Sequence, residues 1–130
     1  MNDQQWKDFF KVCANVLGKG NACSSISESW CSWTTFQRLE EDSGYWTSGL
    51  PNKNETGNES IQDGGAWGQP FLYEQLAHII VPKYFIWEVH LDSEFTHGQK
   101  EQDLEALSKE LDRNNIVHRK TSRVVEIKLY

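Results

Sequence analysis

Residues 84–91 read YFIWEVHL, and residues 123–130 read RVVEIKLY. In both stretches every second side chain is apolar. This is the two-residue period of a strand with one buried face. The pattern predicts strands at Tyr84–Leu91 and Arg123–Tyr130. A further strand is expected over Ile116–Lys120, joined to the last one by a turn at Thr121 and Ser122.

The N-terminal part of the chain has the period of an amphipathic helix. From Trp6 to Leu17 apolar side chains recur at positions i, i+3, i+4 and i+7. Asn2 or Asp3 can cap the start of this helix, and Gly18 stands where a helix commonly ends. The sequence therefore predicts a helix that covers a core with one face.

Two more helices are predicted in the second half, over Phe71–Ile80 and over Gln99–Asn114, and Pro82 is expected to end the first of them. The segment Trp30–Leu39 fits neither period cleanly, so a short helix or a strand is expected there. Helices mixed with a few strands indicate an α+β fold. We expect one domain, residues 1–130, with a small, mostly antiparallel sheet packed against helices.

The segment from Asp42 to Pro70 holds most of the glycines and many turn-forming residues. It is too long for a plain connection between two elements. We therefore expect a long Gly-rich loop over about residues 42–70, either flexible or held in place by its aromatic side chains.

The charge balance limits the kinds of partner. The 130 residues carry 19 Asp and Glu against 13 Lys and Arg, a net charge of −6. Such a chain repels the phosphate backbone, so no nucleic-acid partner is expected. No apolar run is long enough to cross a bilayer and the start lacks the pattern of a signal peptide, so we expect a cytoplasmic protein without a membrane partner.

The cysteines Cys13, Cys23 and Cys31 are odd in number and form no CxxC pair. A fully paired disulfide framework within one chain is therefore excluded, and the spacing lacks the usual pattern of zinc fingers. Reduced, partly buried thiols are predicted. No cofactor is expected.

Histidines and carboxylates near the strand Tyr84–Leu91 are the main candidates for a metal site. Alternation places Glu88 and His90 on one face of that strand, with His97 just beyond it. Imidazole and carboxylate groups bind divalent metals and transfer protons. A metal site requires three or four converging ligands, whereas the sequence places only two together, so a solvated strand face is the favoured interpretation.

Two other histidines have polar or basic surroundings. His78 lies within the predicted helix Phe71–Ile80, where a partly buried, hydrogen-bonded histidine is favoured over a catalytic base. His118 precedes a basic cluster of Arg119, Lys120 and Arg123. The cluster can hold a phosphate or an acidic partner, but a mixed surface is the more common role of such residues.

Tryptophans and acids between residues 40 and 67 predict a protein-binding surface. Trp46 and Trp67 lie in the Gly-rich segment, where no core element is expected. Exposed indoles supply buried contact area, and nearby carboxylates steer a basic partner. Folding of both rings back onto the core is the competing interpretation. The predicted contact residues are Glu40, Glu41, Asp42, Trp46, Glu55, Glu59, Asp63 and Trp67.

The acidic composition, together with residues 71–130, FLYEQLAHIIVPKYFIWEVHLDSEFTHGQKEQDLEALSKELDRNNIVHRKTSRVVEIKLY, resembles the immunity proteins of bacterial toxin systems, among them contact-dependent inhibition and related polymorphic toxins. The resemblance is one of class and composition, so it assigns a role to no individual residue. It implies a non-catalytic inhibitor that binds a cognate basic toxin, such as a cationic nuclease domain, and covers its active site.

Two other classes of function remain open at this stage. One is a small metal-dependent enzyme that uses Glu88, His90 and His97. The other is a structural or regulatory module that forms a homodimer through the edge of its sheet.

Overall fold

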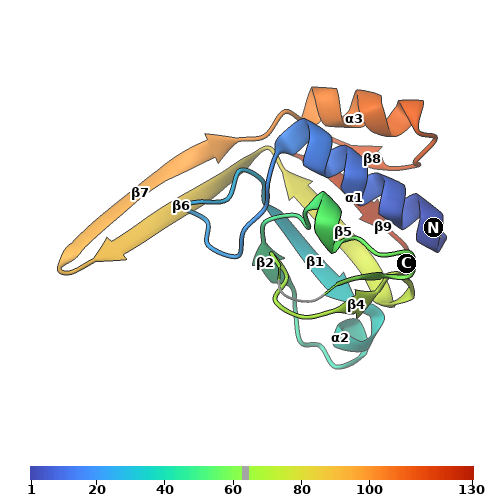
Figure 1. The fold of residues 1–130 in the computed structure, drawn as a ribbon, viewed down its shortest axis with the longest axis horizontal. Helices are drawn as coiled ribbons and strands as arrows, with labels where there is room; N and C mark the ends of the chain where they lie inside the picture. Colours follow the sequence, from blue (N-terminus) through green and yellow to red (C-terminus); the bar gives the residue numbers. More distant parts are fainter. Residues whose placement is uncertain (63–64) are drawn as a thin grey trace.

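The computed structural model describes residues 1–62 and 65–130, and its centre is a five-stranded antiparallel sheet with the strand order β2-β1-β5-β9-β8. Helices α1 and α3 lie side by side over one face of this sheet (Figure 1). The predicted α+β fold is confirmed. The elements of this body are α1 (Asp3–Leu17), β1 (Cys31–Thr35), β2 (Trp46–Ser48), β5 (Leu76–Pro82), α3 (Leu104–Arg113), β8 (Arg119–Lys120) and β9 (Val124–Lys128).

Helix α1 forms as its sequence predicts. The side chain of Asn2 accepts a hydrogen bond from the backbone N–H of Gln5, and the side chain of Gln5 accepts one from that of Asn2. This reciprocal pair satisfies two N–H groups that the first turn leaves free. Gly18 ends the helix at a φ of 96°, which an L side chain rarely adopts. The buried face carries Trp6, Phe9, Phe10, Val12 and Cys13.

The helix predicted over Phe71–Ile80 is wrong. This segment forms β4 (Phe71–Leu72), a 3-10 turn η2 (Tyr73–Gln75) and the central strand β5. Neighbours on both sides bury Leu76 to Ile79 completely or nearly so. A strand buried on both faces has a continuous apolar run without alternation, and such a run also fits a helical spacing. The adjacent Ile79, Ile80 and Val81 are β-branched residues, which favour a strand.

The ambiguous segment Trp30–Leu39 contains both of the expected structures. Strand β1 ends at Thr35, whose side chain accepts a hydrogen bond from the N–H of Arg38 and so caps α2 (Phe36–Glu40). Two different periods follow one another within ten residues. Neither period alone could fit the whole segment.

The Gly-rich stretch contains short elements, and its aromatic side chains pack on the core. Within it lie β2, the 3-10 turn η1 (Lys53–Glu55) and β3 (Ser60–Ile61), which pairs with β4. The indole of Trp67 stacks on Trp33 with ring centroids 3.8 Å apart, and Trp46 stacks on the same residue at 4.5 Å. Of the two alternatives for this segment, these contacts favour the one in which aromatic rings hold it in place.

The predicted strand over Tyr84–Leu91 is confirmed as β6, but its partner β7 (Glu94–Glu101) was not predicted. The two strands form a hairpin that projects away from the body (Figure 1), and we call residues Tyr84–Glu101 the arm. The helix expected from Gln99 begins only at Leu104, because the first residues of that range extend β7. The C-terminal strands β8 and β9 form as predicted, with shorter bounds.

Within residues 1–62 and 65–130, no helix has both the length and the apolar character that crossing a bilayer requires.

Candidate functional site

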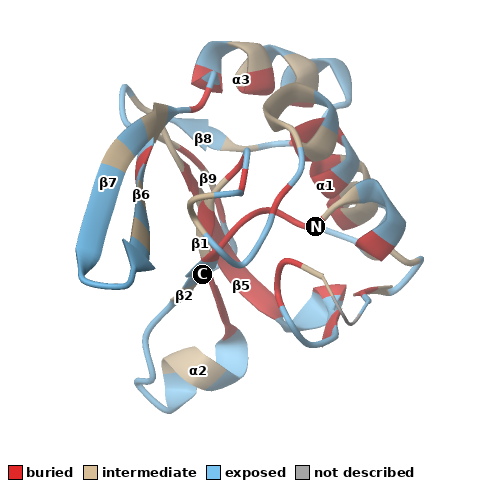
Figure 2. Ribbon diagram, turned by 60° about the vertical axis from the view of Figure 1, so that its left-hand side comes forward, coloured by how far each residue is buried: buried red, intermediate tan, exposed pale blue. Residues whose placement is uncertain are grey.

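Several of the large apolar side chains that are exposed in the described chain lie together on the arm. Ile86 and Leu91 are each 68% exposed, and Phe95 is 52% exposed. Figure 2 shows that most of β6 and β7 is solvent-accessible, in contrast to β1 and β5 in the middle of the central sheet. Apolar side chains gathered on a projecting element are typical of a protein-binding surface.

On one face of the arm every residue is exposed, and we call it the open face. Directly opposite residues of an antiparallel pair share a face, so Glu88 lies beside His97 and His90 beside Phe95. The residues of the open face are Tyr84, Ile86, Glu88, His90, Phe95, His97, Gln99 and Glu101.

The other face of the arm is covered by the body near its base. Phe85 stacks on Trp30 with ring centroids 5.5 Å apart. Further out, the indole of Trp87 lies over Gly98, and a Cβ on that glycine would come within 2.6 Å of the ring. Gly98 is therefore required for Trp87 to lie flat across the hairpin.

The outer part of the arm is acidic. Glu88, Asp92 and Glu94 are exposed, and the sequence contains no Lys or Arg between Tyr84 and Gln99. Apart from the two histidines, the ionisable side chains of this outer part are thus all acidic. A surface of this composition complements a basic protein.

The metal candidates share the open face without forming a metal site. Glu88 Oε2 lies 3.8 Å from His90 Nε2. The ring of Phe95, however, contacts both imidazoles, with centroid distances of 4.6 Å to His90 and 5.2 Å to His97. In the part of the chain that the structure describes, no three His, Cys, Asp or Glu side chains converge as metal ligands would.

The predicted acidic run lies far from the arm. Glu40, Glu41 and Asp42 are exposed at the end of α2, which follows the last residue of β1. Trp30, which stacks on the base of the arm, precedes the first residue of β1. The acidic run and the arm therefore lie at opposite ends of this strand, as Figure 1 shows.

Two of the predicted contact residues are buried, and the expectation that they face a partner is corrected. Trp67 is only 7% exposed, and its Nε1–H donates to the carbonyl of Gly49 at 3.2 Å. Glu55, also 7% exposed, accepts hydrogen bonds from the backbone N–H groups of Asn52 and Ala66 at 3.0 and 2.9 Å. Both side chains stabilise the fold of the Gly-rich segment.

The remaining predicted contact residues have mixed positions. Trp46 is half-buried, and the guanidinium of Arg38 lies 3.6 Å from its ring centroid. This cation–π contact occupies the outer face of the indole. Glu59 is exposed, whereas Asp63 lies outside the described residues. The predicted set is therefore not a single continuous surface.

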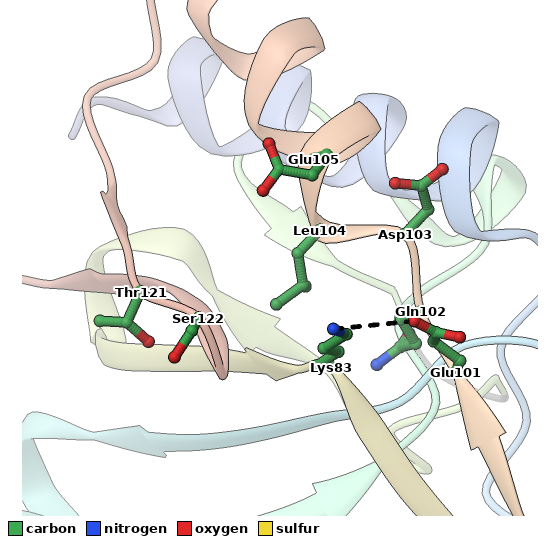
Figure 3. Close-up of a pocket in the computed structure, with 8 residues that line it drawn as sticks. All are labelled: Lys83, Glu101, Gln102, Asp103, Leu104, Glu105, Thr121 and Ser122. Carbon is green, nitrogen blue, oxygen red and sulfur yellow. Dashed lines mark ion pairs between the residues drawn. The ribbon is translucent and has the colours of Figure 1, made fainter.

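A polar pocket of about 430 Å³ lies at the base of the arm, between β7, α3 and the turn of the last two strands (Figure 3). Its carboxylates already have partners. Glu101 lies 3.9 Å from Lys83 Nζ, Asp103 caps α3 by accepting the N–H of Ala106, and Glu105 pairs with Lys120. These carboxylates therefore serve local ion pairs and the cap of α3.

His78 lies in β5 and not in a helix, and the expected hydrogen bonding is present at Nδ1 only, since Nε2 has no hydrogen-bond partner in the described chain. Its Nδ1 is 2.7 Å from the Tyr45 hydroxyl, which is 2.9 Å from the Tyr130 hydroxyl. Nε2 lies 3.7 Å from Glu126 Oε2. Burial lowers the pKa of His78, an effect that Glu126 opposes and Lys128 reinforces. Burial likewise raises the pKa of Tyr45 to about 12. The cluster joins the C-terminus to the sheet.

The His78 environment predicts a pH-dependent stability. Below the ordinary pKa of 6.5 the unfolded chain binds a proton at His78 that the folded chain resists, so the free energy of unfolding should fall on acidification. The free energy of unfolding is measured by urea titration at about pH 7.5 and about pH 5.5. Between these two pH values it should fall by more in the wild type than in His78→Asn. An equal loss in both proteins would contradict this prediction.

The basic cluster near His118 is largely paired. Arg119 Nη1 lies 3.7 Å from Glu126, and Lys120 Nζ lies 2.6 Å from Glu105. His118 itself is held between the Ser108 hydroxyl at 2.7 Å and the carbonyl of Ile116 at 2.8 Å. These contacts support the mixed-surface interpretation.

The cysteines are free thiols, as predicted. Cys13 and Cys31 are buried, and desolvation raises the pKa of both thiols well above its ordinary value. Cys23 is exposed, and its pKa is lowered chiefly by a hydrogen bond with Ser25.

Sequence reasoning treated the exposed side of β6 as a possible metal site and missed the arm as a whole. A signal was present, because Asp92-Ser93 follows β6 directly and a two-residue turn allows the chain to return. Comparison with models of protein families, with curated proteins and with solved structures finds no match for this chain.

Proposed function

We propose that this protein is a non-catalytic inhibitor that binds a basic protein through the arm, in the manner expected of an immunity protein. The observation that carries the proposal is the projection of Tyr84–Glu101 from the body, with Ile86, Leu91 and Phe95 exposed among acidic residues. The partner it fits is a toxin with a cationic cleft that normally holds phosphate groups, such as a nuclease.

Shape, apolar area and charge together suit the arm to bind a basic protein. A two-stranded hairpin is narrow enough to enter a concave site, where apolar side chains lose contact with water. Carboxylates at its tip occupy positions that phosphates would take and raise the rate of encounter with a basic protein. Glu88, Asp92 and Glu94 supply these charges.

Charge also argues against self-association through the arm. Two copies of the arm would bring acidic groups of the same sign together at the tip, which is unfavourable. Light scattering over a range of protein concentrations shows whether the protein forms a homodimer instead.

The proposal is tested with two variants that each remove three negative charges. Glu88→Gln/Asp92→Asn/Glu94→Gln alters the arm, and Glu40→Gln/Glu41→Gln/Asp42→Asn alters the acidic run at the end of α2. Each immobilised protein is challenged with a soluble extract of its source cells, and retained proteins are identified by mass spectrometry. For the retained basic protein, association with the arm variant should slow roughly tenfold or more at low salt.

The control variant distinguishes the effect of the charges on the arm from the effect of the net charge of the protein. It should retain the wild-type association rate within about twofold, because its net charge equals that of the arm variant. Loss of binding only in the control would move the site to α2 and overturn the assignment to the arm. Retention of no basic protein by the wild type, or a dimer that is independent of concentration, would overturn the proposed function.

A further inference from the structure

A lysine near the base of the arm is held by backbone carbonyl groups of the body. Lys100 lies on β7, directly opposite Phe85. Its Nζ lies 2.9 Å from the carbonyl oxygen of Ser27, 3.1 Å from that of Ser25 and 3.4 Å from that of Ser24. An ammonium group has three N–H donors, so these three acceptors satisfy it completely.

The turn that supplies these carbonyls is itself fixed to the body. The N–H of Ser27 donates to the carbonyl of Cys23 at 3.1 Å, which closes the turn. The Ser27 hydroxyl donates to the carbonyl of Ser29 at 2.6 Å and accepts the N–H of Asn21 at 2.8 Å. Ser29 directly precedes Trp30 and β1, so the turn moves with the central sheet.

Few other groups determine the direction of the arm. The N–H of Glu88 donates to the Ser24 hydroxyl at 3.3 Å, and Phe85 stacks on Trp30. In the described part of the chain, the hydrogen bonds that join the arm to the body all lie at its base or at this turn, and none involves residues 89–99. The outer half of the arm depends on this attachment for its orientation.

We infer that Lys100 is a positioning residue that fixes the direction of the arm relative to the central sheet. Without Lys100, only its two connecting segments, the stack of Phe85 on Trp30 and the single hydrogen bond to Ser24 would hold the hairpin. It would then swing about its base, and binding would have to order it. A cation bound by three carbonyls of a fixed turn removes that freedom beforehand. That a fixed arm favours binding of a partner rests on the proposed function. That Lys100 fixes the arm does not depend on it.

The test requires no partner. Residual dipolar couplings and 15N relaxation are measured for Lys100→Met, Lys100→Arg, Lys83→Met and the wild type. Methionine keeps the length of the chain but cannot donate, and Lys83 is a matched control because its contact with Glu101 is exposed. In the wild type and in Lys83→Met, one alignment tensor should fit both arm and sheet, with arm order parameters near about 0.85.

In Lys100→Met the arm should need its own tensor, and its order parameters should fall below about 0.6. The hairpin amides should stay protected from exchange, which distinguishes swinging from unfolding. Lys100→Arg should restore much of the order, because a guanidinium also donates to carbonyls. A single tensor and unchanged order in Lys100→Met would overturn the inference. A failure to find a basic partner would overturn only the proposed function.

Discussion

Replacement of Trp33 by alanine should lower the free energy of unfolding by about 3–5 kcal/mol. Trp33 is fully buried at the centre of the aromatic core, stacked on Trp67 and Trp46 and in edge contact with Phe71 at 4.6 Å. Alanine would remove the shared contact of all three rings and leave a cavity. Since a domain of this size is stable by only about 5–15 kcal/mol, much of its stability depends on this one residue.

Trp33→Phe is the matched control for this experiment. Phenylalanine keeps an aromatic ring, and it also removes the indole N–H, a buried donor without a hydrogen-bond partner in the described chain. In urea unfolding, Trp33→Phe should therefore lower the free energy of unfolding by less than half as much as Trp33→Ala does. An alanine variant within about 1 kcal/mol of the wild type would show that the stacked rings contribute little.

Gln102→Leu should be the other strongly destabilising change, with an expected loss of about 2–4 kcal/mol. This amide is 3% exposed and joins three chain segments. Its Oε1 accepts the N–H of Trp30 at 2.9 Å, and its Nε2 donates to the carbonyls of Trp30 and Pro82 at 3.0 and 2.8 Å. Leucine has a similar size but would leave these backbone groups without partners.

Gln99→Leu provides the same substitution at an exposed position of the arm. It should change the free energy of unfolding by no more than about 0.5 kcal/mol. Urea unfolding at neutral pH, followed by tryptophan fluorescence, compares the two variants. If their midpoints coincide, the buried amide does not hold the base of the arm.

The parts of the fold that the sequence predicts well are those with one buried face. Helix α1 and strand β9 each have a clear period, because water on one side and core on the other impose it. Strand β6 alternates as well, although Phe85 is its one buried residue and the rest of the strand is half-buried or exposed. Strand β5 lacks this contrast, since it lies in the middle of the sheet, and its apolar run was taken for a helix. Strand β7 is exposed on most of its length, so only the pairing with β6 determines it.

The candidate site was predicted only in its chemistry. Acidic residues next to exposed indoles were expected between residues 40 and 67, where Trp67 and Glu55 belong to the interior. The structure instead combines exposed apolar side chains with acidic residues on the arm. The long-range stacking of Trp67 on Trp33 has no local signature in the sequence. Likewise, the hydrogen bonds of Glu55 depend on how the segment around it folds back, which its neighbours along the chain do not reveal.

The contact between Trp33 and Trp67 has an optical consequence. Two indoles whose centroids are 3.8 Å apart and whose planes differ by 8° should couple their electronic transitions, since the coupling of transition dipoles falls steeply with separation. The near-ultraviolet and far-ultraviolet circular dichroism of this protein should therefore contain an exciton couplet. Its disappearance would give a spectroscopic signal for loosening of the interior even while the backbone stays folded.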